Sequence, residues 1–583
     1  MADRSGSRSG GSGNASPKYT VSGVLNKLTG GNMSARVAVV FFAFAAIALI
    51  FVVRLVYMQV IMAGEWSQQA QDSRTVDITI TPKRGTIYDR NGNVLATSVD
   101  CTTIYCNPTE ITDVDGAAKQ LKKILGGKAS TYKEVLSRQN TSFSYVKRQV
   151  DNDVAKKVKA LNITGLYYLD DSKREYPNGS VGGQIIGLCD IDGNGLTGLE
   201  LYYNSVLGGS AGHVTYEQGN TGIVISGTEQ RTDAVDGQDI VISLDLDMQA
   251  YVEKQVAAGA KNLGGDSGQC VLMDGSTGEI LAACSTPLLD PTDTSNIKSG
   301  ATELKVVSQA FEPGSIFKSV TMLACLEEGV VKPSTKVFCP AKLKADEYTI
   351  SDAHERGDTT YTATEIMQHS SNVGISLCAQ KLGFDKLYQY IGKYKLDEEL
   401  SGVDFPGEAS GYLSNVSDWS EIQADNVSFG QGVSVTPIQI TRFYAMLANG
   451  GTSVKPHFLI SKPQSDGKIS YGTEKVVTNS KAIKQLDKML TKVVTDGTGT
   501  AAQIDGYDVA GKTGTAEYVE DGSSGYVDGT YNLSFVGYLP NSDSDLVCFV
   551  GVTKVPADSV TTGIFKDIMS FAINRYNVSP QRG

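Results

Sequence analysis

The chain has 583 residues, of which 41% are hydrophobic, and a formal net charge of −12. This length is enough for about three or four globular units, each with its own core. The acidic balance and the lack of a basic stripe argue against a nucleic-acid partner, because proteins that bind nucleic acids usually present a basic face to the phosphates.

Residues 1–36 are predicted to be a disordered cytoplasmic tail. The first sixteen residues are rich in serine, glycine and arginine and hold almost nothing to bury. The tail carries five basic residues and one acidic residue, a net charge of +4. By the positive-inside rule this end stays in the cytoplasm, and the chain after Tyr57 is exported.

A transmembrane anchor is predicted at residues 37–57. Apolar residues run without a break from Val37 to Val53 and continue past Arg54 to Tyr57, which is long enough to cross roughly 30 Å of hydrocarbon. A cleaved signal peptide is the alternative, but its apolar part is shorter and leads to a cleavage site between small residues. Arg54 and the bulky Leu-Val-Tyr after it favour an uncleaved single-pass anchor.

Residues 58–236 are predicted to form an α+β domain. The alternation at 75–81 predicts a strand, and Asn91-Gly92 is a strong signal for a hairpin. Helical stretches are expected between residues 110 and 160, with glycine-rich sequence after them. A short apolar strand then leads into a helix, so a second domain is expected to cover residues 237–583.

Three short motifs follow one another in the second domain: Ser315-Ile-Phe-Lys318, Ser370-Ser-Asn372 and Lys512-Thr-Gly514. The order SxxK, SxN, K[ST]G marks serine enzymes that are acylated by D-Ala-D-Ala peptides and penicillins. Similar letters also occur at Ser130/Lys133, Ser144/Lys147, Ser295/Lys298 and Lys298-Ser-Gly300. Those matches precede or flank polar, loop-like sequence and lack the later motifs at comparable positions.

The segment after Ser315 is predicted to be a buried helix. Apolar residues fill Ile316–Leu326 and Gly329 ends the run, with Pro313 just before the first turn. Backbone N–H groups are free at a helix N-terminus, and a residue three positions later lies on the same face. Ser315 and Lys318 are therefore expected to meet through local structure alone.

Further helix and strand signals surround the other two motifs. Thr362 and Glu365 have capping-box spacing, so Ser370 is expected at a junction between two helices, the second of which ends at Gly383. Thr436-Pro437 predicts another helix start. The remaining predicted elements are a hairpin at 269–285, adjacent antiparallel strands at 509–518, 533–539 and 546–555, a polar loop at 520–530 and a closing helix at 563–576.

The chemistry expected of the first two motifs begins with removal of the proton from the serine hydroxyl. A serine hydroxyl is a weak nucleophile until a base takes its proton, and Lys318 can be that base only when it is neutral. Burial and a second positive charge from Lys512 are expected to lower the Lys318 pKa from its ordinary value of about 10.4. Ser370 is expected to relay a proton and the Asn372 amide to bind a substrate carbonyl, with helix capping as the alternative for both.

The third motif suits the edge of an active-site sheet. Glycine lets a substrate backbone approach the strand, and lysine and threonine side chains hold a carboxylate. An extended peptide is expected to pair along this strand. The backbone N–H groups of Ser315 and Thr515 are expected to stabilise the oxyanion, at about 3 to 4 kcal/mol each. The predicted substrate-binding residues are Thr513, Gly514 and Thr515.

A different enzyme class shares some of these letters. Gly506–Thr513 matches the GxxxxGK[ST] pattern of P-loop nucleotidases. A P-loop needs a hydrophobic strand before it and a helix after it, whereas the sequence before Gly506 is no such strand and the sequence after Gly514 continues as extended chain. The predicted export also separates this segment from ATP.

No metal or cofactor is predicted. The nine cysteines lack CxxC spacing and the histidines lack HExxH or other ligand spacing. Cys270 and Cys284 flank a turn, so a cross-strand disulfide between them is one possibility, and buried small residues are the alternative. The histidines, expected at the surface or in structural roles, are His213, His354, His369 and His457.

The motifs and several further segments resemble class B penicillin-binding proteins, the membrane-anchored D,D-transpeptidases that cross-link peptidoglycan. The likeness covers nearly all of the chain after the anchor. The segments are Phe311-Glu-Pro-Gly-Ser315-Ile-Phe-Lys318, Phe429-Gly-Gln-Gly432, Val435-Thr-Pro-Ile-Gln439, Arg84-Gly-Thr-Ile-Tyr-Asp89-Arg90-Asn-Gly92, Arg174-Glu-Tyr-Pro177 and Gly195-Leu-Thr-Gly198-Leu-Glu200.

The resemblance implies an α/β (α+β) transpeptidase fold with a central antiparallel sheet, and an elongated pedestal domain of the dimerisation type. It implies that Ser315 attacks the penultimate D-Ala carbonyl of a stem peptide, expels the terminal D-Ala and passes the acyl group to an amine of a neighbouring stem. Penicillins are expected to acylate the same serine. The other catalytic residues are then Lys318, Ser370, Asn372 and Lys512.

The resemblance also implies partners. Besides stem peptides, β-lactams and the membrane, the pedestal is expected to contact a polytopic glycosyltransferase of the shape, elongation, division and sporulation family. A simple turn or a surface charge is the alternative role for the pedestal motifs. The residues expected at this pedestal interface are Arg84, Gly85, Asp89, Arg90, Gly195, Gly198 and Glu200.

Two other functions compete with a transpeptidase. A secreted β-lactamase or carboxypeptidase uses water as the acceptor, and the anchor and large pedestal argue against it. A β-lactam sensor with an inactive site is disfavoured by the intact motifs. No acidic glycosyltransferase signature precedes the catalytic domain, so the bifunctional class A form is not expected, and the C-terminus leaves no room for small penicillin-binding repeats. The pedestal motifs look closest to the division and sporulation branches, which predicts septal or spore cell-wall synthesis.

Overall fold

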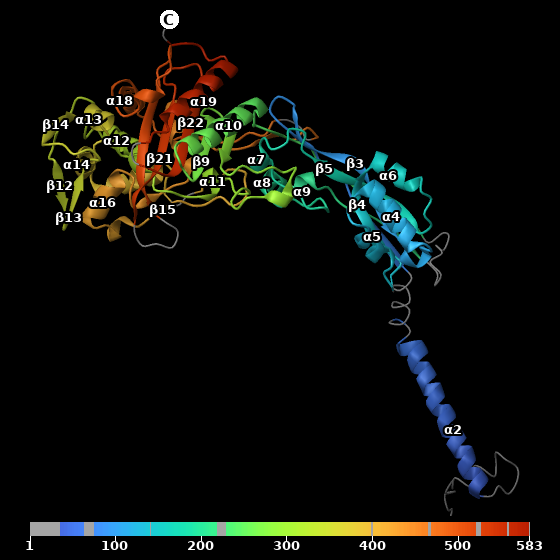
Figure 1. The fold of residues 1–583 in the computed structure, drawn as a ribbon. Helices are drawn as coiled ribbons and strands as arrows, with labels where there is room; N and C mark the ends of the chain where they lie inside the picture. Colours follow the sequence, from blue (N-terminus) through green and yellow to red (C-terminus); the bar gives the residue numbers. More distant parts are fainter. Residues whose placement is uncertain are drawn as a thin grey trace, which may run out of the picture. The chain divides into compact units, whose positions relative to one another are not determined.

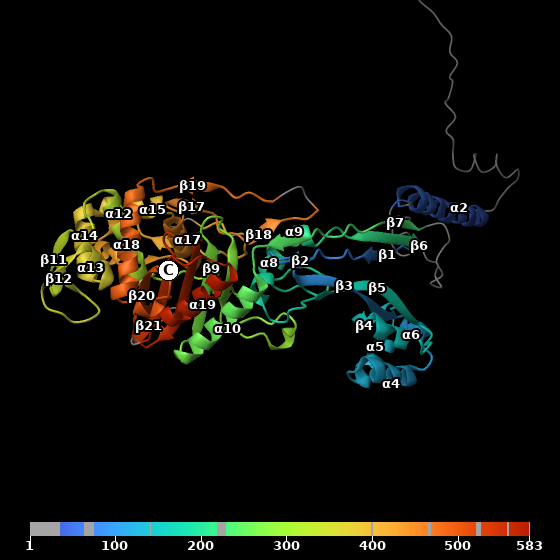
Figure 2. The ribbon, with the colours of Figure 1, turned by 90° about the horizontal axis from the view of Figure 1, so that it is seen from above.

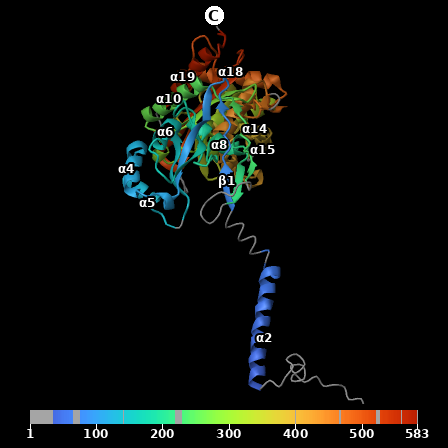
Figure 3. The same ribbon diagram turned by 90° about the vertical axis from the view of Figure 1, so that its right-hand side faces the viewer.

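The computed structural model describes residues 35–62, 64, 75–139, 141–217, 229–397, 400–464, 468–519, 526–556 and 559–581. The predicted tail lies outside these ranges except for Ala35 and Arg36, which begin helix α2, Ala35–Val56. A π-helical turn, Tyr57–Ile61, continues α2 (Figure 3). Within the described part of the chain, Val37–Ile61 is the one helix long and apolar enough to span a membrane, with a mean hydropathy of 2.9. It fits the predicted anchor and extends it by one turn.

The chain divides into two compact units, residues 1–79 with 213–232 and residues 80–212 with 233–583. In the first unit a three-stranded sheet has the order β1-β6-β7. The predicted strand at 75–81 is the first of these strands. Their bounds are β1 Thr75–Ile80, β6 Gly212–Glu217 and β7 Gln230–Thr232.

The second unit begins with a sheet covered by helices on one face. The predicted hairpin at Asn91-Gly92 is present, and Gly92 takes the positive φ of +85° that such a turn needs. The long strand β3 pairs with both β4 and β5, and apolar residues of this sheet pack against α4, α5 and α6 (Figure 2). The bounds are β2 Ile87–Tyr88, β3 Val94–Cys106, β4 Ser144–Asp151, β5 Leu166–Glu175, α4 Val114–Leu125, α5 Ala129–Leu136 and α6 Asn152–Lys159.

This sheet continues into sequence beyond residue 236. Strand β8, Ile240–Ile242, runs parallel to β2, with Ile87 opposite Ile240. Strand β18, Leu459–Ser461, pairs with the other edge of β8, so the order is β18-β8-β2-β3-β4 with β5 also paired to β3. Strands from both predicted domains therefore share one sheet.

A second, five-stranded antiparallel sheet forms the centre of the catalytic part, in the order β10-β9-β22-β21-β20. Helices α10 and α19 cover one face (Figure 1). Helix α17 packs against β9, β21 and β22 on the other. The hairpin and three strands predicted here are confirmed. The bounds are β9 Ser267–Asp274, β10 Ile280–Ser285, β20 Ala510–Val519, β21 Tyr526–Tyr538, β22 Leu546–Val555, α10 Leu246–Asn262, α17 Pro437–Ala448 and α19 Thr562–Arg575.

One predicted loop is partly wrong. Residues 526–530 of the expected loop at 520–530 belong to strand β21, because the pairing with β20 continues to Tyr526 opposite Val519. Residues 520–525 lie outside the described ranges. The polar, glycine-rich composition of this segment therefore predicted a loop where the first residues of β21 lie.

Helices form a second layer beside β20. Helices α12, α13, α14 and α18 pack on one another (Figure 2), and α18 also packs on β20. A pair of two-stranded ribbons, β11 with β14 and β12 with β13, extends from this layer and is called the arm, residues 336–362. The bounds are α12 Lys318–Glu327, α13 Ala363–Gln368, α14 Asn372–Leu382, α15 Phe384–Lys393, α16 Glu421–Ser428, α18 Ser480–Asp496, β11 Lys336–Cys339, β12 Lys342–Ala345, β13 Tyr348–Ser351 and β14 Thr359–Thr362.

Candidate active site

Ser315 lies in a 3₁₀ turn, η4 (Gly314–Phe317), that leads directly into α12. The predicted buried helix is present, although its first turn is tighter than an α-helix. Lys318 is the first residue of α12 and its side chain is fully buried. The Lys318 Nζ lies 3.0 Å from the Ser315 Oγ, so the local pairing expected of SxxK is formed.

The SxN motif closes around the same lysine. Lys318 Nζ donates to the Ser370 carbonyl oxygen and to Asn372 Oδ1, each at 2.6 Å. Ser370 lies between α13 and α14, as predicted, and the capping box of Thr362 and Glu365 starts α13. The Asn372 amide donates one hydrogen bond to the Ser351 carbonyl at 3.0 Å, which leaves its second N–H available for a substrate carbonyl.

Ser370 connects the two active-site lysines. Its Oγ lies 3.2 Å from Lys318 Nζ and 2.9 Å from Lys512 Nζ. Its φ of +55° is unusual for a residue with a side chain and costs about 1 to 3 kcal/mol. This conformation aims the hydroxyl between the two amines, where it can pass a proton from one to the other.

Lys512 lies within strand β20 at the edge of the central sheet, and its side chain is fully buried. The strand continues to Val519, so no helix follows the GxxxxGK[ST] letters and the P-loop alternative is excluded on structure. Thr513 Oγ1 lies 3.3 Å from Lys512 Nζ and 2.8 Å from Thr498 Oγ1. Thr498 was not predicted, because only the fold places its loop beside β20.

Burial lowers the pKa of both lysines. The Lys318 pKa falls to about 7 because its amine is removed from water, and the Asp352 carboxylate partly opposes this by favouring the ammonium. Burial also holds the Lys512 pKa well below its ordinary value, and the nearby Lys318 charge lowers it further. One of the two amines is therefore able to take up a proton near neutral pH.

Strand β20 passes close to the nucleophile turn. A Cβ on Gly514 would lie 2.2 Å from Ser534 Oγ and 3.2 Å from the Pro313 carbonyl oxygen, so only glycine allows this approach. A Cβ on Gly314 would lie 2.7 Å from the Thr515 carbonyl oxygen, so this carbonyl points out of the sheet. The N–H and C=O of a residue in an antiparallel ladder point to the same side, so the Thr515 N–H faces the nucleophile turn as well.

The Phe429–Gly432 segment forms hydrogen bonds with the nucleophile turn and with the residues just before it. Gly314 N–H donates to the Gly430 carbonyl at 2.9 Å, and Gly432 N–H donates to Glu312 Oε1 at 2.8 Å. Gly430 has a φ of +87°, and a Cβ there would lie 2.3 Å from the Gly314 carbonyl oxygen. These hydrogen bonds fix the backbone immediately before Ser315.

Asp352, which directly follows β13 in the arm, supports the SxN motif. Its carboxylate accepts hydrogen bonds from Ser371 Oγ at 2.8 Å, from the Val373 N–H at 3.0 Å and from Arg356 Nε at 2.6 Å. Sequence reasoning missed this residue because no local spacing links the arm to a motif that follows it by one helix. The contacts fix the start of α14 and thereby the position of Asn372.

The comparisons with known proteins agree with this geometry. Residues 268–570 match the family described as "Penicillin binding protein transpeptidase domain", and residues 79–242 match the "Penicillin-binding Protein dimerisation domain". The chain belongs to the class B penicillin-binding proteins. Its activity is that of a peptidoglycan D,D-transpeptidase.

Relatives of this penicillin-binding protein come from distant bacteria. It is 32% identical to stage V sporulation protein D of Bacillus subtilis, over 92% of this chain and 84% of that protein. It is 28% identical to the peptidoglycan D,D-transpeptidase FtsI of Buchnera aphidicola, over 91% of this chain and 93% of that protein. A crystal structure of penicillin-binding protein 3 from Mycobacterium tuberculosis, complexed with aztreonam, covers 86% of this chain and is itself covered to 98%, with 27% identity and a TM-score of 0.68.

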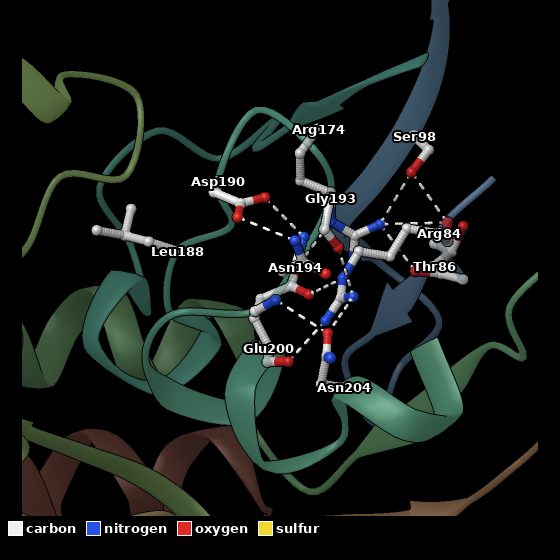
Figure 4. A network of polar contacts seen from close by, with 12 residues as sticks. Arg84, Thr86, Ser98, Arg174, Leu188, Asp190, Gly193, Asn194, Glu200 and Asn204 are labelled. Carbon is white, nitrogen blue, oxygen red and sulfur yellow. Dashed lines mark hydrogen bonds and ion pairs between the residues drawn. The ribbon is translucent and has the colours of Figure 1, made fainter. Parts of the chain in front are cut away.

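In this penicillin-binding protein the residues predicted at a pedestal interface contact other parts of the same chain. Glu200 is fully buried and binds two arginines (Figure 4). Arg84 Nε donates to Glu200 Oε2, and Arg174 Nε donates to Glu200 Oε1 at 2.7 Å. Arg84 also donates to the carbonyl of Gly193 at 2.9 Å and to Asn204 Oδ1 at 2.8 Å. The network joins the segment before β2 to α8, Gly198–Tyr202.

The expected contact of these residues with another protein stays a prediction. Arg90 is half-buried, and its Nη2 lies 3.2 Å from Glu279 Oε2 of the catalytic part. Asp89 accepts the N–H groups of Asn91 and Asn93 and, at 3.3 Å, that of Leu246 at the start of α10. Both residues therefore join the pedestal to the catalytic part of the same chain. The six residues of the set that are buried within this chain are Arg84, Gly85, Asp89, Gly195, Gly198 and Glu200.

All nine cysteines of the penicillin-binding protein are free thiols. Cys270 and Cys284 face each other in the β9–β10 register, as the sequence suggested, but the Cys270 Sγ instead lies 3.9 Å from the Cys548 Sγ on β22. Within the described ranges, no three His, Cys, Asp or Glu side chains gather to hold a metal ion. The cysteines of β9, β10 and β22 serve as small core residues.

The contacts of Asp352 predict opposite pH effects for two substitutions. Acylation by a penicillin is expected to rise with pH through about 7, as Lys318 loses its proton. Asp352→Asn removes a negative charge that favours the ammonium, so the rise is expected to move to lower pH, by roughly half a pH unit to one. Arg356→Gln removes the cation beside Asp352 and is expected to move it to higher pH. Stopped-flow acylation rates between pH 5 and 9 measure both shifts.

A purely structural effect gives a different result. If Asp352 only supported the backbone, both variants would acylate more slowly at every pH with an unchanged midpoint. Asp358→Asn is a suitable control, because Asp358 Oδ1 also accepts a backbone N–H in the arm, that of Ala341 at 2.8 Å, but does not contact the SxN motif. Its pH profile is expected to match that of the unaltered protein.

Proposed function

We propose that this class B penicillin-binding protein cross-links stem peptides through an acyl-enzyme on Ser315, and that β-lactams acylate the same serine. The observation that carries the proposal is the continuous set of contacts from Ser315 Oγ through Lys318 and Ser370 to Lys512. The proposal is supported because two hydroxyl groups and two lysine amines lie in contact, which is what a nucleophile, a base, a proton relay and a second amine require. The catalytic residues proposed are Ser315, Lys318, Ser370, Asn372 and Lys512.

In the first half-reaction, neutral Lys318 takes the Ser315 proton as Oγ attacks the penultimate D-Ala carbonyl. The backbone N–H groups of Ser315 and Thr515 stabilise the oxyanion, since the first lies in the opening turn of a helix and the second faces that turn. Collapse of the tetrahedral intermediate breaks the peptide bond. The departing D-Ala amine receives its proton from Lys318, directly or through Ser370 Oγ.

The substrate carboxylate has a second effect in this mechanism. Thr513 Oγ1 lies 3.3 Å from the buried Lys512 amine, and Thr515 follows two residues later on β20. The hydroxyl groups of both threonines are proposed to bind the terminal carboxylate. A carboxylate next to Lys512 favours its ammonium form. A charged Lys512 in turn disfavours a proton on Lys318, so substrate binding itself prepares the base.

The second half-reaction transfers the acyl group to an amine. The amine of a neighbouring stem attacks the ester carbonyl and gives its proton to Lys318, which returns it to Ser315 Oγ as the ester bond breaks. We propose an amine rather than water as the acceptor, because a membrane anchor and a large pedestal suit an enzyme that works on the cell wall. The acceptor stage is the one at which a transpeptidase differs from a carboxypeptidase.

We also propose a cellular setting. The 32% identity to stage V sporulation protein D and the 28% identity to FtsI support a role in septal or spore cell-wall synthesis. The basic tail at residues 1–36 supports a cytoplasmic N-terminus, with the pedestal at 58–236 and the transpeptidase domain at 237–583 outside the cell. A polytopic glycosyltransferase is the proposed membrane partner.

Acyl-enzyme lifetime and acceptor use test the proposal. The purified protein is expected to form one covalent adduct with benzylpenicillin, stable for many minutes by intact mass spectrometry. With a thioester donor, added D-amino acid is expected to divert the acyl group into an amide product. Rapid penicillin hydrolysis would instead identify a β-lactamase, and release of free acid with no amide product would identify a carboxypeptidase.

A further inference from the structure

Helix α17 and the residue two positions before it contact the nucleophile segment at two points. Ahead of Ser315, the Phe311 N–H donates to the Val435 carbonyl at 2.9 Å, and the Val435 N–H donates to the Phe311 carbonyl at 3.0 Å. Beyond Ser315, the hydroxyl of Tyr444 donates to the Ile316 carbonyl at 2.9 Å. The nucleophile therefore lies between two hydrogen-bonded points, neither of which takes part in the proposed mechanism.

Tyr444 is held firmly by the core. Its side chain is fully buried, and its ring makes edge contacts with Phe443 and Tyr538, with centroids 5.5 and 6.5 Å away. It belongs to α17, which begins with a capping box at Thr436 and packs on the central sheet. Side chains packed in this way keep one rotamer. The Tyr444 hydroxyl is thus a donor with a fixed position.

The same hydroxyl makes a second contact, with Ser319 Oγ at 2.8 Å. A carbonyl oxygen can only accept a hydrogen bond, so the single proton of the Tyr444 hydroxyl points to Ile316. Ser319 must then donate to Tyr444. In sequence the two contacts lie on either side of Lys318. One of them holds the opening turn, and the other satisfies the tyrosine oxygen.

The Ile316 carbonyl lies where the helix changes its geometry. In the 3₁₀ turn η4 the Lys318 N–H donates to the Ser315 carbonyl, whereas α12 begins at Lys318 with α-helical geometry. Hydrogen bonds in 3₁₀ turns have poorer geometry than those in α-helices. A donor from the core fixes the peptide group that follows Ile316. It thereby fixes the direction in which the chain passes from Ser315 to Lys318.

We infer that Tyr444 is a positioning residue for acylation, because its hydroxyl holds the turn in which Ser315 Oγ lies 3.0 Å from Lys318 Nζ. Tyr444 acts through the Ile316 carbonyl and not on the substrate. The inference rests on the proposed function, since it takes Ser315 as the nucleophile and Lys318 as its base.

Tyr444→Phe removes the hydroxyl and keeps the ring. The rate constant for acylation by benzylpenicillin is expected to fall about tenfold, since a misplacement of about 1 Å costs roughly a hundredfold and a smaller shift is expected here. The dissociation constant of the noncovalent complex is expected to change less than twofold, and every molecule is still expected to be labelled. Quenched-flow kinetics of the full chain in detergent measure both constants, and intact mass spectrometry measures the labelled fraction.

Two matched variants lose a buried hydrogen bond but keep the donor to Ile316. Ser319→Ala removes the group that donates to Tyr444. Tyr394→Phe makes the same chemical change at the other end of α12, where the Tyr394 hydroxyl donates to Glu327 Oε1 at 2.5 Å. Both variants are expected to acylate within twofold of the unaltered protein. All three variants are expected to lower the thermal midpoint by similar amounts, roughly 2 to 4 °C.

A merely structural role of Tyr444 gives a different pattern. Partial unfolding lowers the labelled fraction and leaves the rate constant of the folded molecules unchanged, so this result for Tyr444→Phe would overturn the inference. Equal slowing in Ser319→Ala or Tyr394→Phe would also overturn it, because a general loss of packing would then explain the rate. In each case, normal acylation of the unaltered protein still supports the proposed function. Absence of acylation in the unaltered protein would remove both.

Discussion

Replacing Ser315 by alanine is expected to abolish covalent labelling by penicillin and to lower transpeptidation by about a million-fold, as removal of the nucleophile does in other serine enzymes. Its Oγ lies 3.0 Å from the base and stands at the opening turn of a helix whose N–H groups are free to bind an oxyanion. Ser370 is also near Lys318, but its hydroxyl lies between two amines, Lys318 Nζ at 3.2 Å and Lys512 Nζ at 2.9 Å. It is not expected to replace the missing nucleophile.

A fluorescent penicillin and a denaturing gel measure this effect. Ser295→Ala is a matched control, because Ser295 begins another SxxK sequence and lies in an exposed turn, η3 (Thr294–Asn296). That variant is expected to label like the unaltered protein. Labelling of Ser315→Ala at normal stoichiometry would show that a different side chain forms the acyl-enzyme.

The largest expected loss of stability comes from Glu200→Ala. The side chain is fully buried and holds two arginines whose own side chains are 5% and 8% exposed. Its removal leaves two buried guanidinium groups without a carboxylate, which costs about 3 to 5 kcal/mol. The midpoint of the pedestal's thermal transition is expected to fall by roughly 10 °C.

Differential scanning calorimetry of the full chain in detergent measures this loss. Glu175→Ala is the control, because Glu175 lies 3.2 Å from Lys173 in an ion pair at the surface, which is worth less than about 1 kcal/mol. Glu200→Gln keeps the shape of the side chain, so its thermal midpoint is expected to lie between those of Glu200→Ala and Glu175→Ala. A midpoint for Glu200→Ala as high as that for Glu175→Ala would mean that the buried network adds little to the stability of the pedestal.

Local signals predicted much of the fold. The capping boxes at Thr362 and Thr436, the hairpin turn at Asn91-Gly92 and the pairing of Ser315 with Lys318 all depend on residues within a few positions of one another. Such features follow from dihedral preferences and from the period of a helix. They therefore form in much the same way in any fold that contains them.

Features that depend on distant segments were harder to predict. The motifs predicted Lys512 in the same site as Ser315, but not that Ser370 would lie between Lys512 and Lys318 with a strained backbone. Asp352 was missed because a single carboxylate has no spacing to recognise. The sequence also did not predict that Glu200 binds two arginines of the same chain, because the spacing of the three residues shows no link between them.

The shared sheet has a consequence for the order in which the protein matures. Chains are made from the N-terminus, and β2 and β8 must wait for β18 before their sheet is complete, by which time Ser315 and Ser370 have been made. Lys512 comes later still. A nascent or truncated chain that ends between residues 461 and 512 contains every strand of the sheet that β2, β8 and β18 share, but it lacks Lys512. The ability to react with substrates or antibiotics therefore arises only when almost the whole polypeptide has been made.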